Sequence, residues 1–342
     1  MATKAVNPPP RIAALDFTKG ALVVIMVLYH WLNYFVSPQG DFYKYLRFLT
    51  PSFICISGFL ISHTYLSKYA ITDARLPKRL ITRGLKILGV FFLLNLVIGL
   101  VLTGPAHREL FFLHMGLRNA FLTYVVGNVY VAGVGRGVAF YILVPIAYLL
   151  VLCAGLLVVC RWFKYTFYAT FVLFLLAILS LQRNGQSSGN LELLTIGLLG
   201  VILGYIPGAK IQQLTRFALP LAAAYLGYLV AITLWNEIFP LQIVGVCLSL
   251  AVIYLLGSKA GEPGGIRRTI LLLGKYSLFA YIGQVIILQL LRRGLPYNEL
   301  PIAARGVFFL AGLGLTVLCV WLVDQTRPRV PVADRLYKAV FA

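Results

Sequence analysis

Long apolar runs, separated by short polar or basic segments, recur along the whole chain of 342 residues. Many of these runs approach the length of about 20 residues that an α-helix needs to cross a hydrocarbon core. The pattern predicts ten membrane-spanning helices, at 11–36, 46–66, 85–102, 137–160, 165–182, 191–208, 217–234, 240–257, 270–291 and 302–323. We therefore expect an all-α, polytopic membrane helical bundle that forms one transmembrane domain over residues 1–342.

The segment 105–135 fits this pattern least well, because Arg118 and Asn119 interrupt its apolar residues. We interpret it as an external, re-entrant or partly amphipathic segment, and a full span is the alternative. It carries His107 and His114, which could contact a substrate at the outer face or could be surface residues without a role.

The distribution of basic residues predicts the orientation of the ten spans. With both termini in the cytoplasm, the inner segments hold 21 of the 30 Lys and Arg, and six of these lie in the segment 68–86. An excess of positive charge on the cytoplasmic side is the rule for helical membrane proteins. The sequence therefore predicts cytoplasmic termini and a cytoplasmic 68–86 segment.

The composition agrees with a membrane protein. Hydrophobic residues make up 60% of the chain, charged residues 12%, and the mean hydropathy is +0.88, which excludes a soluble globular protein. The net charge of +20 is explained by this topology and by contact with anionic membrane lipids, so no nucleic-acid partner is expected. The five cysteines have no metal-type spacing, so neither zinc nor disulfide bonds are predicted.

The first span carries the most informative polar residues, Asp16, Lys19 and His30. A helix turns about 100° per residue, so these three side chains share one face. His30 stands roughly 16 Å beyond Lys19 along the axis, at membrane depth. It could be a hydrogen-bonded packing residue, but an imidazole there also suits proton transfer near neutral pH. The spacing alone does not identify the reaction.

Three stretches of the sequence resemble the acyltransferase 3 family of integral membrane acyltransferases. The first runs from Arg11 to Gly20 and continues to His30, and the second is the Ser57-Gly58-Phe59-Leu60 signature, followed by Arg83 and Lys86 three residues apart. The third is the late segment 273–281, Leu-Gly-Lys-Tyr-Ser-Leu-Phe-Ala-Tyr. The resemblance extends over the predicted topology, with matched residues mainly in the first ninety positions and in 273–284.

The sequence departs from the family pattern at three of these places. Lys19 and Lys86 stand where the family usually has Arg, and Gln284 stands where a His often follows the late Tyr. A Lys is a point charge rather than a bidentate fork, so its contacts with an anionic group differ from those of Arg. The first stretch is also similar to transmembrane N-acetyltransferases of amino sugars, which leaves O-acylation and N-acylation as alternatives.

The resemblance implies a catalytic centre in the first span. His30 would act as a general base or would carry the acyl group, and both roles suit a neutral imidazole. Asp16 and Lys19 would support it from the inner end of the helix. Tyr281 and Gln284, three residues apart on one helix face, would line the cavity.

The resemblance also implies the two substrates. The donor would be cytoplasmic acyl-CoA, in the first instance acetyl-CoA, as a co-substrate and without a bound cofactor. Arg79, Arg83 and Lys86 would bind its phosphates, although membrane anchoring explains these charges equally well. Ser57 would donate to the thioester carbonyl, or else to a carbonyl of its own helix. The acceptor would be a carbohydrate or glycolipid at the outer face of a bacterial inner membrane.

A second class of function is a secondary transporter or a carrier of lipid-linked sugar, in which Asp16, Lys19 and His30 would form an ion relay. A transporter of this kind is expected to repeat such a site in its second half. Residues 170–342 contain no His, so the arrangement is not repeated. The sequence therefore favours the enzyme.

Overall fold

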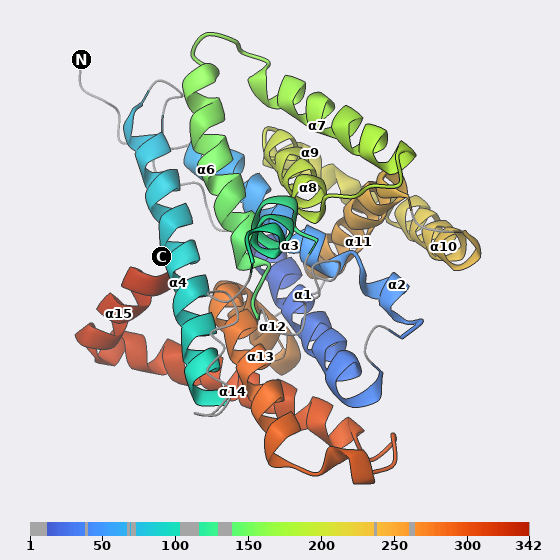
Figure 1. Ribbon diagram of the computed structural model, residues 1–342, viewed down its shortest axis with the longest axis vertical. Helices are drawn as coiled ribbons and strands as arrows, with labels where there is room; N and C mark the ends of the chain where they lie inside the picture. Colours follow the sequence, from blue (N-terminus) through green and yellow to red (C-terminus); the bar gives the residue numbers. More distant parts are fainter. Residues whose placement is uncertain are drawn as a thin grey trace. The chain divides into compact units, whose positions relative to one another are not determined.

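The computed structural model of the protein describes residues 12–37, 40–66, 69, 73–102, 116–128, 139–235, 238–259 and 264–341. Every regular element within these ranges is a helix, which confirms the predicted all-α class (Figure 1). Most of the segment 105–135, including His107 and His114, lies outside the described residues.

Seven described helical stretches are long and apolar enough to cross a membrane. The count is eight if α12 (Gly265–Lys275) and α13 (Ser277–Gly294), which meet at a bend of 96°, form one span. Two further expected spans correspond to shorter apolar helices, α6 (Leu143–Val159) with 17 residues and α8 (Gly189–Leu203) with 15. The structure therefore shows a multi-pass helical protein, whereas ten spans and cytoplasmic termini stay predictions.

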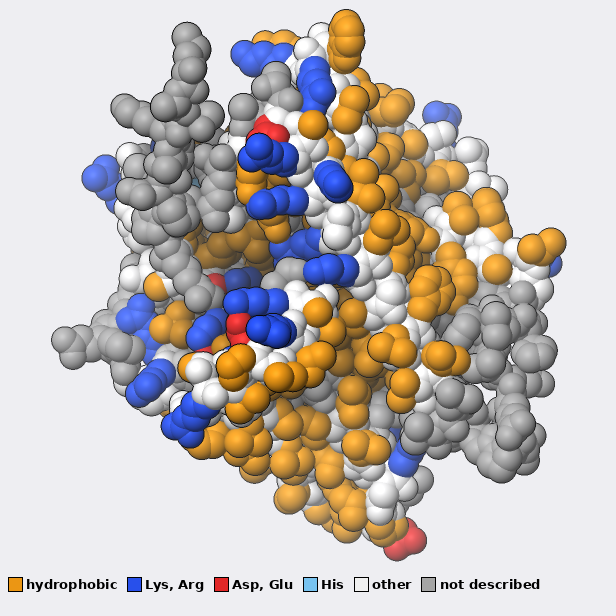
Figure 2. Space-filling view, turned by 90° about the vertical axis from the view of Figure 1, so that its left-hand side faces the viewer, with side chains coloured by type: hydrophobic (Ala, Val, Ile, Leu, Met, Phe, Trp, Pro, Cys, Tyr) orange, Lys and Arg blue, Asp and Glu red, His pale blue; other side chains and the backbone are white. Residues whose placement is uncertain are grey.

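The surfaces of the expected spans are apolar, as contact with lipid requires. Leu173, Leu226 and Leu310 belong to three different spans, and each exposes more than half of its side chain. Broad hydrophobic areas cover the face drawn in Figure 2, where Lys and Arg side chains far outnumber Asp and Glu. Exposed apolar area of this extent indicates a membrane or a partner protein as the natural surroundings.

The described chain divides into two compact units, one formed by Ile54–Pro207 and the other by Arg11–Phe53 with Gly208–Ala342. This division does not test the prediction of a single domain. In the first unit, α4 packs along α6, and both α6 and α7 pack on α8. Its described helices are the end of α3 (Leu49–Leu60), η2 (Ile61–Leu66), α4 (Arg75–Leu102), α5 (Leu117–Ala120), η4 (Phe121–Val126), α6, α7 (Thr166–Arg183) and α8.

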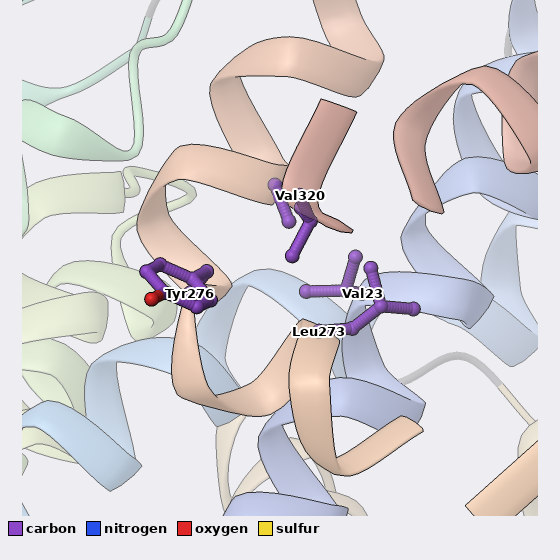
Figure 3. Packing of buried hydrophobic residues seen from close by; sticks show 5 residues of the cluster. Val23, Leu273, Tyr276 and Val320 are labelled. Atoms are coloured by element: carbon purple, nitrogen blue, oxygen red, sulfur yellow. The ribbon is translucent and has the colours of Figure 1, made fainter. Parts of the chain in front are cut away.

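The second unit is built around α1 (Ala13–Trp31), which contacts α11, α12, α13 and α14. Val23 on α1 meets Leu273 on α12 and Val320 on α14 in a buried apolar cluster, beside Tyr276 at the bend (Figure 3). The other helices of this unit are η1 (Leu32–Val36), α2 (Tyr43–Leu46), α9 (Gly208–Gln212), η5 (Gln213–Phe217), α10 (Ala218–Leu234), α11 (Phe239–Lys259), η6 (Tyr297–Glu299), α14 (Gly306–Arg329) and α15 (Pro331–Phe341).

The basic segment 68–86, expected as a cytoplasmic loop, is helical from Arg75 onward. The structure begins α4 at Arg75, ten residues before the expected span at 85–102. The Asp73 carboxylate accepts a hydrogen bond of 2.9 Å from the Arg75 backbone N–H and so satisfies a free donor at the start of the helix. Because Lys and Arg are themselves good helix formers, the basic residues extend the span as a helix.

The expected span at 270–291 contains a corner that the hydropathy pattern did not indicate, since the chain turns by 96° at Tyr276. Contacts with α14 hold this corner. The Tyr276 hydroxyl donates to Asp324 Oδ1 at 2.7 Å, and Lys275 Nζ lies 2.5 Å from the same oxygen. The neighbouring Arg327 pairs with Asp334 at 2.6 Å. Hydrogen bonds from Lys338 and Arg327 lower the pKa of Asp334, so this carboxylate stays charged and keeps α15 attached to α14.

Candidate active site

His30 lies near the end of α1 among aromatic rings of the second unit. Its imidazole stacks on Tyr34 with ring centroids 5.5 Å apart. The ring centroids of Tyr29 and Tyr281 lie 5.0 and 6.4 Å from that of the imidazole. The Nε2 atom of His30 is buried and makes no hydrogen bond with the described residues. Buried polar atoms in proteins nearly always have a partner, so an exception suggests a functional role.

Gln284 has two buried polar atoms without a hydrogen-bond partner among the described residues, whereas His30 has one. It lies on α13, one helical turn beyond Tyr281, and its side chain is fully buried. Neither its amide nitrogen nor its amide oxygen has a hydrogen-bond partner among the described residues. Leaving a buried polar group unpaired costs roughly 1–3 kcal/mol. A buried Leu would avoid this cost, so the structure marks Gln284 as a residue kept for its polar groups.

The helix changes geometry immediately after His30. From Leu32 to Val36 the chain forms a π-helical turn, and the side-chain Nδ2 of Asn33 donates to the Tyr29 carbonyl at 3.1 Å. The wider turn alters the direction of the following side chains, and Tyr34 stacks on the imidazole. Such turns often occur at functional sites. The sequence contains no clear signal for this turn, and the sequence analysis missed it.

Asp16 and Lys19 form an ion pair of 2.7 Å at the other end of α1. Their spacing of three residues places both on one face of the helix, where each is largely shielded from solvent. They lie about 16 to 21 Å from His30 by the rise of the helix. The geometry therefore assigns them to the helix end, away from the imidazole.

Close helix contact fixes this end of α1. A Cβ atom on Gly274 of α12 would lie 1.8 Å from the carbonyl oxygen of Asp16. A Cβ atom on Gly20 would lie equally close to the carbonyl oxygen of Ile270. Only glycine leaves space for two backbones at this distance. The glycines of the first and third sequence stretches are thus contact positions, a role that the sequence analysis did not assign.

The predicted donor-binding residues lie in the first unit, along one face of α4. The Arg83 guanidinium donates to the Tyr65 hydroxyl at 2.6 Å, and that of Arg79 donates to the Tyr69 hydroxyl and lies over its ring. Lys86 is exposed on the same face. Positions 79, 83 and 86 are separated by four and three residues, so the charges form a single stripe.

Ser57 is half-buried on α3, in the same unit. A Cβ atom on the adjacent Gly58 would lie 2.0 Å from the carbonyl oxygen of Gly197 on α8. The Ser-Gly pair therefore marks a close contact between α3 and α8. Whether Ser57 meets a thioester stays a prediction.

No group of three or more His, Cys, Asp or Glu suited to a metal ion occurs within the ranges that the structure describes. The α4 stripe belongs to the first unit and His30 to the second.

The comparisons with known proteins complete this description. The model of a family described as an acyltransferase domain matches residues 12–324, nearly the whole chain. The chain belongs to this acyltransferase family. The match includes His30, the α4 stripe and Gln284, so all the candidate residues lie inside the acyltransferase domain. The searches of curated proteins and of solved structures found no match. A helical, multi-pass chain with this domain is a membrane acyltransferase.

Proposed function

We propose that this acyltransferase moves an acyl group, in the first instance acetyl, from cytoplasmic acyl-CoA to a hydroxyl of a carbohydrate or glycolipid. The acceptor lies at the outer face of a bacterial inner membrane. The observation that carries the proposal is the buried Nε2 atom of His30, which has no partner among the described residues of an acyltransferase domain.

The reaction follows from the chemistry of a neutral imidazole. His30 Nε2 accepts the proton of the acceptor hydroxyl while the hydroxyl oxygen attacks the thioester carbonyl carbon. The carbon–sulfur bond then breaks, and the departing thiolate takes the proton from the imidazolium. A transient acyl group on Nε2 is the alternative route and ends in the same products. An amino group in place of the hydroxyl would give N-acylation.

Gln284 and Tyr281 are proposed to act around the reacting carbonyl. A Gln amide carries two N–H donors and one acceptor, so it can hold an acceptor hydroxyl or stabilise the negative oxygen that develops during the attack. The absence of a partner for Gln284 among the described residues leaves both functions available to a substrate. Tyr281 packs beside the imidazole and helps to fix its orientation.

The stripe on α4 is proposed to bind the donor. Acyl-CoA carries several phosphate charges, and Arg binds phosphate through a bidentate, charge-assisted fork. Tyr65 and Tyr69 support Arg83 and Arg79 through hydroxyl groups, so both guanidiniums keep their full charge for an anion. Lys86 adds a third charge to the stripe. Asp16 and Lys19 are proposed to hold the inner end of α1.

Removing the charges of the stripe tests both the donor and the stripe. We expect purified wild-type protein in lipid nanodiscs to hydrolyse or transfer the acyl group of acetyl-CoA. Replacing Arg79, Arg83 and Lys86 together by Gln should raise the KM for acetyl-CoA at least tenfold, because a charge-assisted contact contributes about 1.5–3 kcal/mol.

The matched control replaces Arg161, Lys164 and Lys210, three exposed basic residues, by Gln. Its KM should equal that of the wild type. An unchanged KM in the stripe variant would reduce the stripe to a membrane anchor, and wild-type protein without any acetyl-CoA turnover would contradict the proposed function.

The orientation in the membrane is a separate proposal with its own test. In a background without the five native cysteines, we expect Ser187→Cys to react with an impermeant thiol reagent on intact cells. Asp73→Cys should react only after permeabilisation, because the positive-inside rule places the α4 stripe in the cytoplasm. The opposite labelling pattern would contradict ten spans with cytoplasmic termini.

A further inference from the structure

An arginine and two tyrosines cluster near the end of α1 and have no role in the scheme above. Arg292, near the end of α13, places its guanidinium 5.7 Å from the ring centroid of Tyr34 and 5.9 Å from that of Tyr297. Its Nε donates to the Tyr297 hydroxyl at 3.3 Å. Tyr34 is the same ring that stacks on the imidazole of His30. The Tyr34 ring is therefore close both to the guanidinium and to the candidate base.

The charge of Arg292 is not balanced by a carboxylate among the described residues. Its contacts are the two Tyr side chains, whereas Arg327 in the same unit pairs with Asp334 at 2.6 Å. Glu299, in the helical turn that contains Tyr297, forms no ion pair with Arg292. A half-buried guanidinium with only aromatic and hydroxyl partners keeps donors for a bidentate anion.

A second guanidinium strengthens the positive potential at this place. Arg305 lies over the ring of Tyr297 at 5.8 Å, close to the distance of Arg292 from that ring. Arg305 also donates to the carbonyl oxygens of Leu300 and Phe35, and the Trp31 indole donates to the Arg305 carbonyl. Arg305 is thus fixed in the framework that joins α14 to the end of α1. Two like charges close to one ring produce a positive potential, which favours an anion.

We propose that Arg292, together with Tyr34 and Tyr297, binds a negatively charged group of the acceptor, a phosphate or a carboxylate. The acceptor is then an acidic carbohydrate. This inference rests on the proposed function and adds to it the chemical class of the acceptor. The Tyr rings supply apolar surface and hydroxyl groups for the sugar, and Arg292 fixes its anionic group near His30.

The test measures binding of three small sugars to purified full-length protein in nanodiscs. The probes are glucose 1-phosphate, glucuronic acid and neutral glucose. Their dissociation constants are measured by microscale thermophoresis. We expect at least one anionic sugar to bind at least tenfold more tightly than glucose. The sugar that binds better identifies the anion as phosphate or carboxylate. Equal binding of all three sugars, or binding of none, would overturn the proposal.

Variants of neighbouring residues assign the anion to Arg292. Arg292→Gln should weaken binding of the anionic sugar at least tenfold, Arg292→Lys should weaken it less, and Arg293→Gln, the same charge change one residue away, should leave it unchanged. Equal losses in Arg292→Gln and Arg293→Gln would overturn the assignment, as would unchanged binding in Arg292→Gln. Thermal unfolding of each variant shows whether a loss of sugar binding comes from misfolding. If Arg292→Gln is misfolded, the binding measured for Arg292→Lys decides whether Arg292 holds the anion.

The test of the anion site is independent of the test of the proposed acyltransferase function. Acetyl-CoA hydrolysis by the wild-type protein needs no acceptor and is measured on the same preparation. A preparation that binds glucose 1-phosphate but never consumes acetyl-CoA would retain the anion site and contradict the acyltransferase chemistry. A preparation that consumes acetyl-CoA but binds no anionic sugar would retain the acyltransferase chemistry and contradict the anion site.

Discussion

Replacing His30 by Gln is expected to lower acyl transfer by two to four orders of magnitude while the protein still inserts and folds. The loss follows from removing a positioned general base, which typically contributes this factor. Gln keeps much of the volume of the imidazole and can pack against Tyr34 and Tyr281. Since His30 Nε2 has no hydrogen-bond partner among the described residues, the substitution breaks no bond of that atom there.

The measurement is transfer from radiolabelled acetyl-CoA to endogenous membrane glycans at equal abundance of each variant. His63→Gln is the matched control, because His63 also lies in a π-helical turn near the end of an expected span and stacks on Phe59 at 5.0 Å. We expect this control to keep near-normal turnover. Normal turnover in His30→Gln would return His30 to the role of a packing residue.

The second large effect is expected from a single methyl group at the contact of α1 with α12. Gly274→Ala would place its Cβ 1.8 Å from the carbonyl oxygen of Asp16, well inside van der Waals contact. A backbone carbonyl cannot move away as a flexible side chain does, so the two helices must separate. Overpacking of this kind costs about 1–3 kcal/mol and occasionally more.

Thermal unfolding of the purified protein tests this expectation. We expect Gly274→Ala to lower the unfolding temperature clearly and to reduce the yield of monodisperse protein. Gly283→Ala on α13 is the control, since apart from the adjoining backbone of α13 no described atom lies within 4 Å of a Cβ built there. If both variants unfold at the wild-type temperature, the contact between Gly20 and Gly274 does not hold α1 in place.

This contact gives a physical meaning to two of the three family stretches. The first contributes Asp16, Lys19 and Gly20 on α1, and the third contributes Gly274 and the corner at Tyr276. Both meet at the N-terminal end of α1, the helix that carries His30. Their shared role in the structure is to position α1, and the chemistry is proposed to take place further along that helix.

The basic stretch before the third span shows how local pattern and structure differ. A run of Lys and Arg after an apolar span is typical of a cytoplasmic loop, and the sequence analysis interpreted it so. The structure makes it the first part of α4 because Asp73 caps the helix start. The charges consequently form a stripe with fixed spacing, which a flexible loop would not provide.

The sequence by itself determined the helical, multi-pass character of this protein, its family and the position of His30 within the first span. Hydropathy and residue spacing act locally, so a single chain reports them directly. Only the tertiary structure decided the bend at Tyr276, the burial of the Gln284 amide without a partner among the described residues, and the contact of Arg292 with two Tyr rings. These features arise from contacts between segments far apart in the chain, such as α1 with α12 and α13, and no local pattern encodes the identity of such partners.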